Sequence, residues 1–304
     1  MKRTISMALM AIFLFSLTAC GGGERSDRLQ VVATTTYAGD LVSIIGGDAV
    51  DVKTLMGVGV DPHDYQPRQS DTDAIAEADV LVVNGLNLEE KFGQILQNLA
   101  GPTLIVLADA LEEGDLLYED ENTPDPHIWF DVSLWAKAAT HVAETLSSID
   151  PDNAEVYARR LDAYLIELNW LDAYIRARLD ELPPERRVLV TAHDAFAYFG
   201  RAYDVEVHAV QGISTSAEAS IADIQALAEL VASLDIPAIF VESSVPERNI
   251  RSVKEAAEAL GHQIVIGGSL YSDSTGDASR GTETYIRTFR ANIDVIVNAL
   301  SEEE

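Results

Sequence analysis

Three of the six histidines in this 304-residue sequence lie at or just beyond the ends of short apolar runs that are typical of β-strands. His63 and His127 each end the tripeptide Asp-Pro-His, and His193 ends the run at 187–193. Because proline fixes φ, an imidazole that follows it has little conformational freedom left to lose on binding a ligand. A neutral imidazole offers one ring nitrogen to a dication while the other donates a hydrogen bond. The pattern therefore predicts a site for a transition-metal dication.

Three histidines need a fourth ligand to close a tetrahedral or similar site. Asp273 follows the last predicted strand, so it occupies the equivalent strand end in the second half of the chain. Asp277 and Glu242 are alternatives for the fourth position, and either could instead lie behind the ligands. The predicted metal ligands are His63, His127, His193 and Asp273.

Each of these residues also has a purely structural interpretation. His63 and His127 could be turn residues that hydrogen-bond the backbone, and His193 could be a buried histidine of the core. Asp273 could cap a turn, because the segment 272–277 is rich in Ser and Asp. The combination of two identical tripeptides with a strand-end histidine favours the metal site.

Residues adjacent to the ligands are expected to lie behind them or to line the site. Those with this expected role are Asp131, Trp129, Glu242 and Tyr65. The three remaining histidines lie on a predicted helix, within a strand and before a strand, and we interpret them as structural; they are His141, His208 and His262.

The N-terminus resembles a bacterial lipoprotein signal. Residues 1–19 start with Lys-Arg after the initiator, continue with an apolar stretch and end in Leu-Thr-Ala before Cys20, the only cysteine. The apolar stretch is shorter than the roughly 20 residues that a membrane-spanning helix needs. We expect cleavage before Cys20, lipidation of that residue, and a flexible tether over 20–28. An ordinary signal peptide, with Cys20 incidental, is the alternative.

The composition is strongly acidic, with a formal net charge of −29. Such a charge argues against nucleic acid as a partner, since the phosphate backbone is itself negative. It raises the local concentration of cations, which suits a cation-binding protein. Solubility and adaptation to a saline habitat explain the charge equally well, so it is consistent with metal capture without demonstrating it.

Two sets of apolar, β-branched runs must position these residues. Four runs precede the middle of the chain and four follow it, each bounded by Gly or Asp and separated by helical stretches. Such runs are typical of buried parallel strands. We predict an α/β fold of two lobes, each with a mainly parallel four-stranded sheet flanked by helices, over residues 29–150 and 183–304. The ligands would then come in pairs from the two lobes.

A long helix is predicted between the lobes, over 151–182. Apolar residues recur at three- to five-residue spacings from Val156 to Leu179, which gives one apolar stripe. Two prolines, Pro183 and Pro184, end the helix. A rigid connector of this kind differs from the flexible strands of hinge-closing receptors, so we expect limited motion between the lobes.

The segments that carry these residues resemble the metal-binding solute-binding lipoproteins of bacterial ABC transporters for zinc and manganese. The resemblance spans essentially the whole mature chain, and its motifs lie at 61–67, 84–89, 125–131, 191–203, 240–244 and 270–274. It implies two α/β lobes joined by one long helix, and metal ligation at the four residues predicted above. It also implies an extracytoplasmic location, a transmembrane ABC permease as partner, and a monomeric binding protein tethered to the membrane only by lipid.

Zinc is the expected ion and manganese the alternative. Three nitrogens and one carboxylate suit zinc better than manganese, and manganese-dedicated members of the family often have glutamate where this chain has His193. Many zinc-dedicated members, however, carry a long His-rich loop before the second ligand. The corresponding loop here, 112–125, is short and acidic and contains no histidine. Affinity should fall as the pH drops through about 6.5, the unperturbed imidazole value.

Two other classes of protein compete with this interpretation. A secreted zinc metalloenzyme would keep one metal position open for water and need a general base, for which Glu242 or Asp194 could serve. Four protein ligands leave no such position, and the sequence contains no HExxH, GxSxG or P-loop pattern. A binding protein for an organic metal chelate would need a wide aromatic cleft and no convergent histidines. We therefore predict that the chain is not an enzyme.

Overall fold

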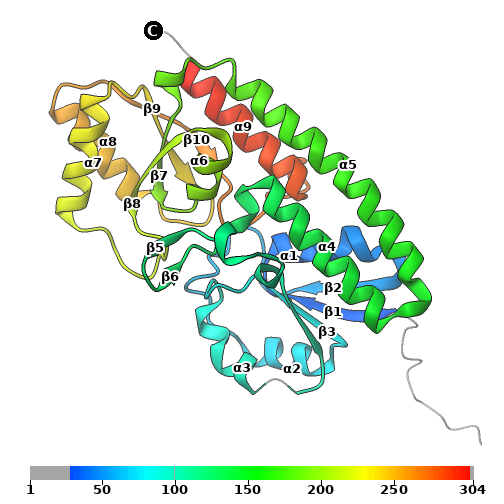
Figure 1. Cartoon of the computed structure of the whole chain (residues 1–304). Coiled ribbons are helices and arrows are strands. Elements are labelled where there is room, and N and C mark those ends of the chain that lie inside the picture. The colour runs from blue at the N-terminus through cyan, green and yellow to red at the C-terminus, as the bar shows by residue number, and fades with distance from the viewer. Residues whose placement is uncertain (1–27, 99, 302–304) are drawn as a thin grey trace, which may run out of the picture.

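Two α/β lobes share one long helix that runs along the length of the molecule (Figure 1). The computed structural model describes residues 28–98 and 100–301, so the expected signal at 1–19 and Cys20 lie outside the described residues. Over the part that is described, none of the helices combines the length and apolar character needed to cross a bilayer.

The N-terminal lobe contains a parallel sheet with strand order β2-β1-β3-β4. Val31 and Ala33 of β1 face a core shared with α1 and α4, whereas Val32 faces the other side, towards α2. β3 is buried at every position, as its uninterrupted β-branched and leucine sequence predicts. The elements of this lobe are β1 (Leu29–Ala33), α1 (Thr36–Gly46), β2 (Val50–Thr54), α2 (Gln69–Glu77), β3 (Val80–Val83), α3 (Gly93–Gln97), β4 (Thr103–Val106) and α4 (Val132–Ile149).

The C-terminal lobe contains the four predicted strands, as two parallel pairs, β7 with β8 and β9 with β10. Where β7 ends beside β9, the Glu242 carboxylate accepts hydrogen bonds from the backbone N–H groups of Ala192 and His193, at 2.8 and 2.9 Å. A side chain therefore takes backbone donors at this junction. The elements are β7 (Val188–His193), α6 (Ala197–Tyr203), β8 (Glu206–Gln211), α7 (Ile221–Ser233), β9 (Ala238–Glu242), α8 (Arg248–Ala259), β10 (Val265–Leu270) and α9 (Tyr285–Ser301).

The connecting helix α5 spans Ala154–Leu179, 26 residues, after a 3₁₀ turn at Pro151–Asn153. Near its start, Arg160 donates a hydrogen bond to the carbonyl of Ile44 at the end of α1. Near its end, Arg178 Nε donates to Asp294 Oδ1 of α9 at 3.1 Å. At 1.5 Å per residue the helix is about 39 Å long. It is therefore fixed to both lobes along its length.

The acidic segment before the second Asp-Pro-His forms a short hairpin that the sequence did not predict. Its strands are β5 (Tyr118–Asp120) and β6 (Thr123–Pro124), paired antiparallel. The hydroxyl of Tyr198 on α6 accepts from the backbone N–H of Leu117 at 3.1 Å and donates to the carbonyl of Asp125 at 3.0 Å. A residue of the second lobe thus fixes the segment that leads into the second turn.

Candidate metal centre

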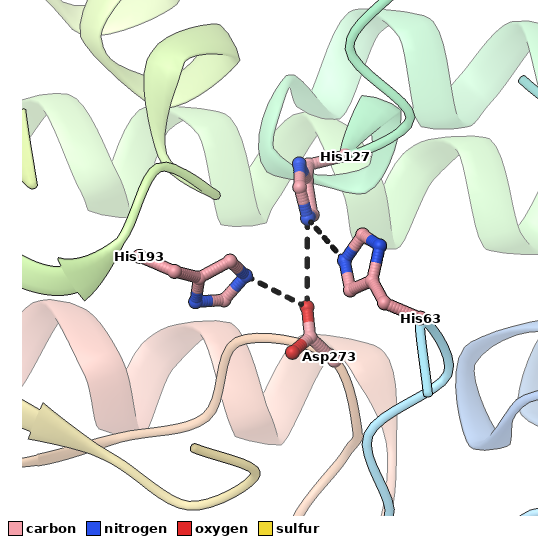
Figure 2. Close-up of side chains that lie close together, drawn as sticks. All are labelled: His63, His127, His193 and Asp273. Carbon is pink, nitrogen blue, oxygen red and sulfur yellow. Dashed lines mark hydrogen bonds and ion pairs between the residues drawn. The ribbon is translucent and has the colours of Figure 1, made fainter. Parts of the chain in front are cut away.

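The four predicted ligands converge at the boundary between the lobes. One potential ligand atom from each of the four lies within 4.8 Å of the others, and all four residues are buried. Figure 2 shows the three imidazole rings pointing towards the carboxylate from different sides. The residues brought together are His63, His127, His193 and Asp273.

Each ligand comes from the loop or strand end that the topology brings to this edge. His63 lies in the loop after β2, and His127 directly precedes the 3₁₀ turn Ile128–Phe130. His193 is the last residue of β7, and Asp273 lies three residues beyond β10. The carboxyl ends of parallel strands are the usual binding edge of open α/β sheets, and here two such edges face each other.

Asp125 orients His127. Its Oδ1 atom accepts a hydrogen bond from the backbone N–H of His127 at 2.9 Å and lies 2.6 Å from the ring Nδ1. A carboxylate can only accept, so Nδ1 carries a proton, and Nε2 is the atom that can offer a lone pair to a metal once it is unprotonated. That Nε2 lies 3.3 Å from His63 Nε2 and 3.6 Å from Asp273 Oδ1.

Glu242 has the same relation to His193. Its Oε2 atom lies 2.6 Å from His193 Nδ1, while its Oε1 accepts from the backbone N–H of the same residue. The Nε2 atom of His193 then points to Asp273 Oδ1 at 3.4 Å. A buried carboxylate thus lies 2.6 Å from Nδ1 behind each ring, and for His127 its hydrogen bond sets the tautomer that presents Nε2 to the centre.

The two oxygens of Asp273 have different environments. Ser244 Oγ donates to Oδ2 at 2.9 Å and lies 2.9 Å from Ser272 Oγ. Oδ1 is buried, faces the imidazoles and has no hydrogen-bond partner. The indole N–H of Trp129 donates to the carbonyl of Ser272 at 3.0 Å, which ties this loop to the first lobe.

The histidines of the two Asp-Pro-His turns differ in charge. Burial lowers the pKa of His63 to about 3. Burial also acts to lower the pKa of His127, but the carboxylates of Asp125 and Asp273 outweigh it and raise that pKa to about 9. At neutral pH His63 is therefore neutral, whereas metal-free His127 holds a second proton.

His193 and Asp273, the second-lobe pair, shift each other's pKa. Burial opposes charge on His193, but the carboxylates of Glu242 and Asp273 outweigh it and raise its pKa well above the usual value. Burial likewise acts against ionised Asp273, and the histidines, with His193 first, hold its pKa well below the usual range. Protons here compensate buried carboxylates, which is the task that a dication would take over.

The arrangement suits a small cation chemically. Three imidazole nitrogens and one carboxylate oxygen converge, and His193 Nε2 and Asp273 Oδ1 are buried without a hydrogen-bond partner. Buried polar atoms in such a state are costly unless something pairs with them. Three nitrogens and one oxygen form a donor set that zinc accepts in tetrahedral geometry.

Two of the four expected neighbours contact a ligand histidine, and the other two contact other parts of the fold. Trp129 packs edge-on against His127, with ring centroids 5.3 Å apart, and Glu242 contacts His193. Asp131 instead caps α4, accepting from the backbone N–H groups of the first turn, because an acidic residue before a helix satisfies its free donors. Tyr65 stacks on Phe92 and donates its hydroxyl to the Asp71 carboxylate, within the core beneath α2.

Two residues that contact the predicted ligands, Asp125 and Ser244, were not predicted from the sequence. Asp125 was treated only as part of a turn, although its repetition before histidine was the available signal. Ser244 gave no signal beyond its place after β9. Asp277, the alternative fourth ligand, is partly exposed and accepts from the backbone N–H of Ser279 at 2.9 Å.

Residues 31–299 match the family described as ZnuA, zinc-uptake complex component A, periplasmic. The chain therefore belongs to this family, whose relatives are extracytoplasmic substrate-binding proteins of metal ABC transporters.

Three relatives illustrate the range of metals in the family. The zinc-binding protein TroA of Treponema pallidum is 44% identical over 89% of this chain and 88% of that protein. Its crystal structure gives a TM-score of 0.88 at 43% identity, covering 90% of this chain and all of that one. The manganese-binding lipoprotein MntA of Bacillus subtilis is 40% identical over 97% of this chain and 98% of that protein. The manganese ABC transporter substrate-binding lipoprotein PsaA of Streptococcus mitis is 30% identical over 99% of this chain and 100% of that protein.

Proposed function

We propose that this chain captures a divalent transition-metal ion between its lobes through His63, His127, His193 and Asp273 and delivers it to an ABC permease for import. The observation that carries the proposal is the convergence of these four buried ligands from both lobes within 4.8 Å. That span fits a bare ion and leaves no room between the ligands for an organic chelate. Binding and release need no covalent chemistry.

Zinc is the ion that the ligand chemistry favours, and manganese is the alternative. Three imidazoles and one carboxylate suit a borderline cation better than a hard one. The zinc-binding relative TroA and the manganese-binding relative MntA are similarly close to this chain, at 44% and 40% identity. The preference for zinc therefore rests on the ligands themselves.

Elemental analysis of the purified mature chain and titration with Zn²⁺ and Mn²⁺ test this proposal. We expect one dication per chain, tighter binding of zinc, and a higher melting temperature in its presence, because an ion that binds only the folded state stabilises it. His63→Ala should remove binding, while His262→Ala serves as the matched control. Equal binding of both ions by wild type and His63→Ala would refute direct metal capture.

The anchor and assembly complete the proposal. Cleavage after residue 19 and lipidation of Cys20 would tether a monomeric receptor, with lobes at 29–150 and 183–304, beside its permease. Mass spectrometry of the membrane fraction should show an acylated N-terminal Cys20, and Cys20→Ser should release the chain into the soluble fraction. A membrane-bound Cys20→Ser variant would contradict lipid anchoring.

A further inference from the structure

One strand end positions both ligands of the second lobe. Glu242, the last residue of β9, holds His193, and Ser244, two residues later, donates to Asp273 Oδ2 at 2.9 Å. Glu242 lies behind the imidazole ring, 2.6 Å from its Nδ1 atom. Ser244 does something different, because it occupies one of the two oxygens of a ligating carboxylate.

The direction of these hydrogen bonds follows from counting protons. A carboxylate that ligates a metal is ionised, and an ionised carboxylate only accepts hydrogen bonds. The single hydroxyl proton of Ser244 therefore goes to Asp273 Oδ2. Ser272 Oγ, which lies 2.9 Å from Ser244 Oγ, must then donate to it. The result is a directed relay from Ser272 through Ser244 to Oδ2.

This relay makes Asp273 asymmetric. Oδ2 is hydrogen-bonded away from the centre, whereas Oδ1 lies 3.4 Å from His193 Nε2 and 3.6 Å from His127 Nε2 with no partner of its own. To ligate through both oxygens, Asp273 would have to share Oδ2 between the metal and the Ser244 hydroxyl, or give up that hydrogen bond. A hydrogen bond to a charged group is among the stronger ones in proteins.

We propose that Ser244 is a specificity-determining positioning residue, which restricts Asp273 to one ligating oxygen and thereby favours four-coordinate zinc over manganese. Zinc is content with four ligands in a tetrahedron, whereas manganese prefers more oxygen ligands and a higher coordination number. A carboxylate free to bind through both oxygens would supply a fifth donor. This inference rests on the proposed metal capture and concerns only which dication is preferred.

The test compares mature wild type, Ser244→Ala and Ser244→Thr, with Ser43→Ala as a matched control. Ser43→Ala removes an equivalent hydroxyl, which donates to the carbonyl of Gly39 within α1 and contacts none of the four ligands in a hydrogen bond. Dissociation constants for Zn²⁺ and Mn²⁺ come from competition with a chelator. We expect Ser244→Ala to shift the ratio of the two constants about tenfold towards manganese, the equivalent of ~1.4 kcal/mol. Ser244→Thr, which keeps the hydroxyl, should restore the wild-type ratio.

Cobalt(II) supplies a readout that a general loss of stability would not move. Tetrahedral cobalt absorbs visible light more strongly than five-coordinate cobalt, so Ser244→Ala should show weaker absorption than wild type and Ser244→Thr. An unchanged metal ratio with an unchanged cobalt spectrum, or equal weakening of both ions, would overturn the inference. If the wild type still binds metal in either of these outcomes, only the inference about Ser244 fails and the proposed metal capture stands. If the wild type binds neither ion, the proposed metal capture itself is refuted.

Discussion

The two Asp-Pro-His turns have the same sequence and the same backbone bond but prepare their histidines in opposite ways. In each, the aspartate Oδ1 accepts from the histidine backbone N–H at 2.9 Å. Asp125 also contacts the His127 ring at 2.6 Å. The other oxygen of Asp61 instead accepts from Thr215 of the second lobe at 2.6 Å. One aspartate orients its own histidine, and the other joins the two lobes.

The contrast shows that the tripeptide Asp-Pro-His determines the conformation of the turn but not the protonation state of its histidine. Burial with little compensation lowers the pKa of His63 to about 3, while neighbouring carboxylates raise that of His127 to about 9. His63 is ready to coordinate at any physiological pH. His127 must first release a proton, so the two turns contribute differently to affinity and to its dependence on pH.

Removal of either histidine should lower zinc affinity more than any other change in the two turns, and by a similar factor in both. His63→Ala and His127→Ala each remove one of four ligands, so we expect affinity for zinc to fall more than about 100-fold, beyond the range typical of a group that merely supports a ligand. Chelator competition measures the loss. His208→Ala, in β8 and partly exposed, is the control. A loss confined to one turn would mean that the other histidine is not a ligand.

Changing the two aspartates should separate the turns. Asp125→Asn keeps an acceptor for the backbone but weakens the hold on the His127 ring, and we expect a ~10–100-fold loss of zinc affinity. Asp61→Asn should cost only a few-fold, since its contacts are to a backbone N–H and to Thr215. Isothermal titration of both variants provides the comparison. Equal losses would show that Asp125 acts only through the turn.

Zinc affinity should depend on pH over a pH range above that expected from a histidine with an ordinary pKa. Because the metal-free His127 pKa is raised to about 9, binding below that pH must displace its proton, and affinity should fall about tenfold per pH unit between 9 and 6.5. His193, whose pKa is also raised, adds to this release. Calorimetry in buffers of different ionisation enthalpy counts the protons. Asp125→Asn should make zinc affinity depend less on pH. If the zinc affinity of the wild type did not change between pH 7 and 9, the prediction would be wrong.

The smallest effect should come from residues that support the fold beside the turns. Asp131→Ala removes the cap of α4 and should cost ~1 kcal/mol of the free energy of unfolding without altering zinc affinity. Thermal and denaturant unfolding measure the first quantity and titration the second. Tyr65→Phe, which removes the hydroxyl bond to Asp71, is the companion in the first lobe. A loss of zinc affinity in either variant would mean that the substituted residue supports the metal site.

The sequence predicts the strands, the long helix and the positions of the four convergent residues because their signals are local. Apolar runs mark buried strands, and prolines mark where turns and helix ends fall. The supporting contacts are not local. Ser244 reaches Asp273 across 29 positions, and Glu242 reaches His193 across 49. Nor does any sequence pattern distinguish the role of Asp131, which caps a helix, from that of Asp125, which lies six residues earlier and orients the His127 ring.

Trp129 gives the molecule an optical probe of its own. Its ring packs edge-on against His127 of the first lobe, while its indole N–H donates to the Ser272 carbonyl beside Asp273 of the second. Trp135 is buried against Tyr285, and Trp170 is 73% exposed on α5, so neither touches the four ligands. The change in intrinsic emission on loading and unloading should therefore come from Trp129, and it can be followed in real time, without a label, at the point where the lobes meet.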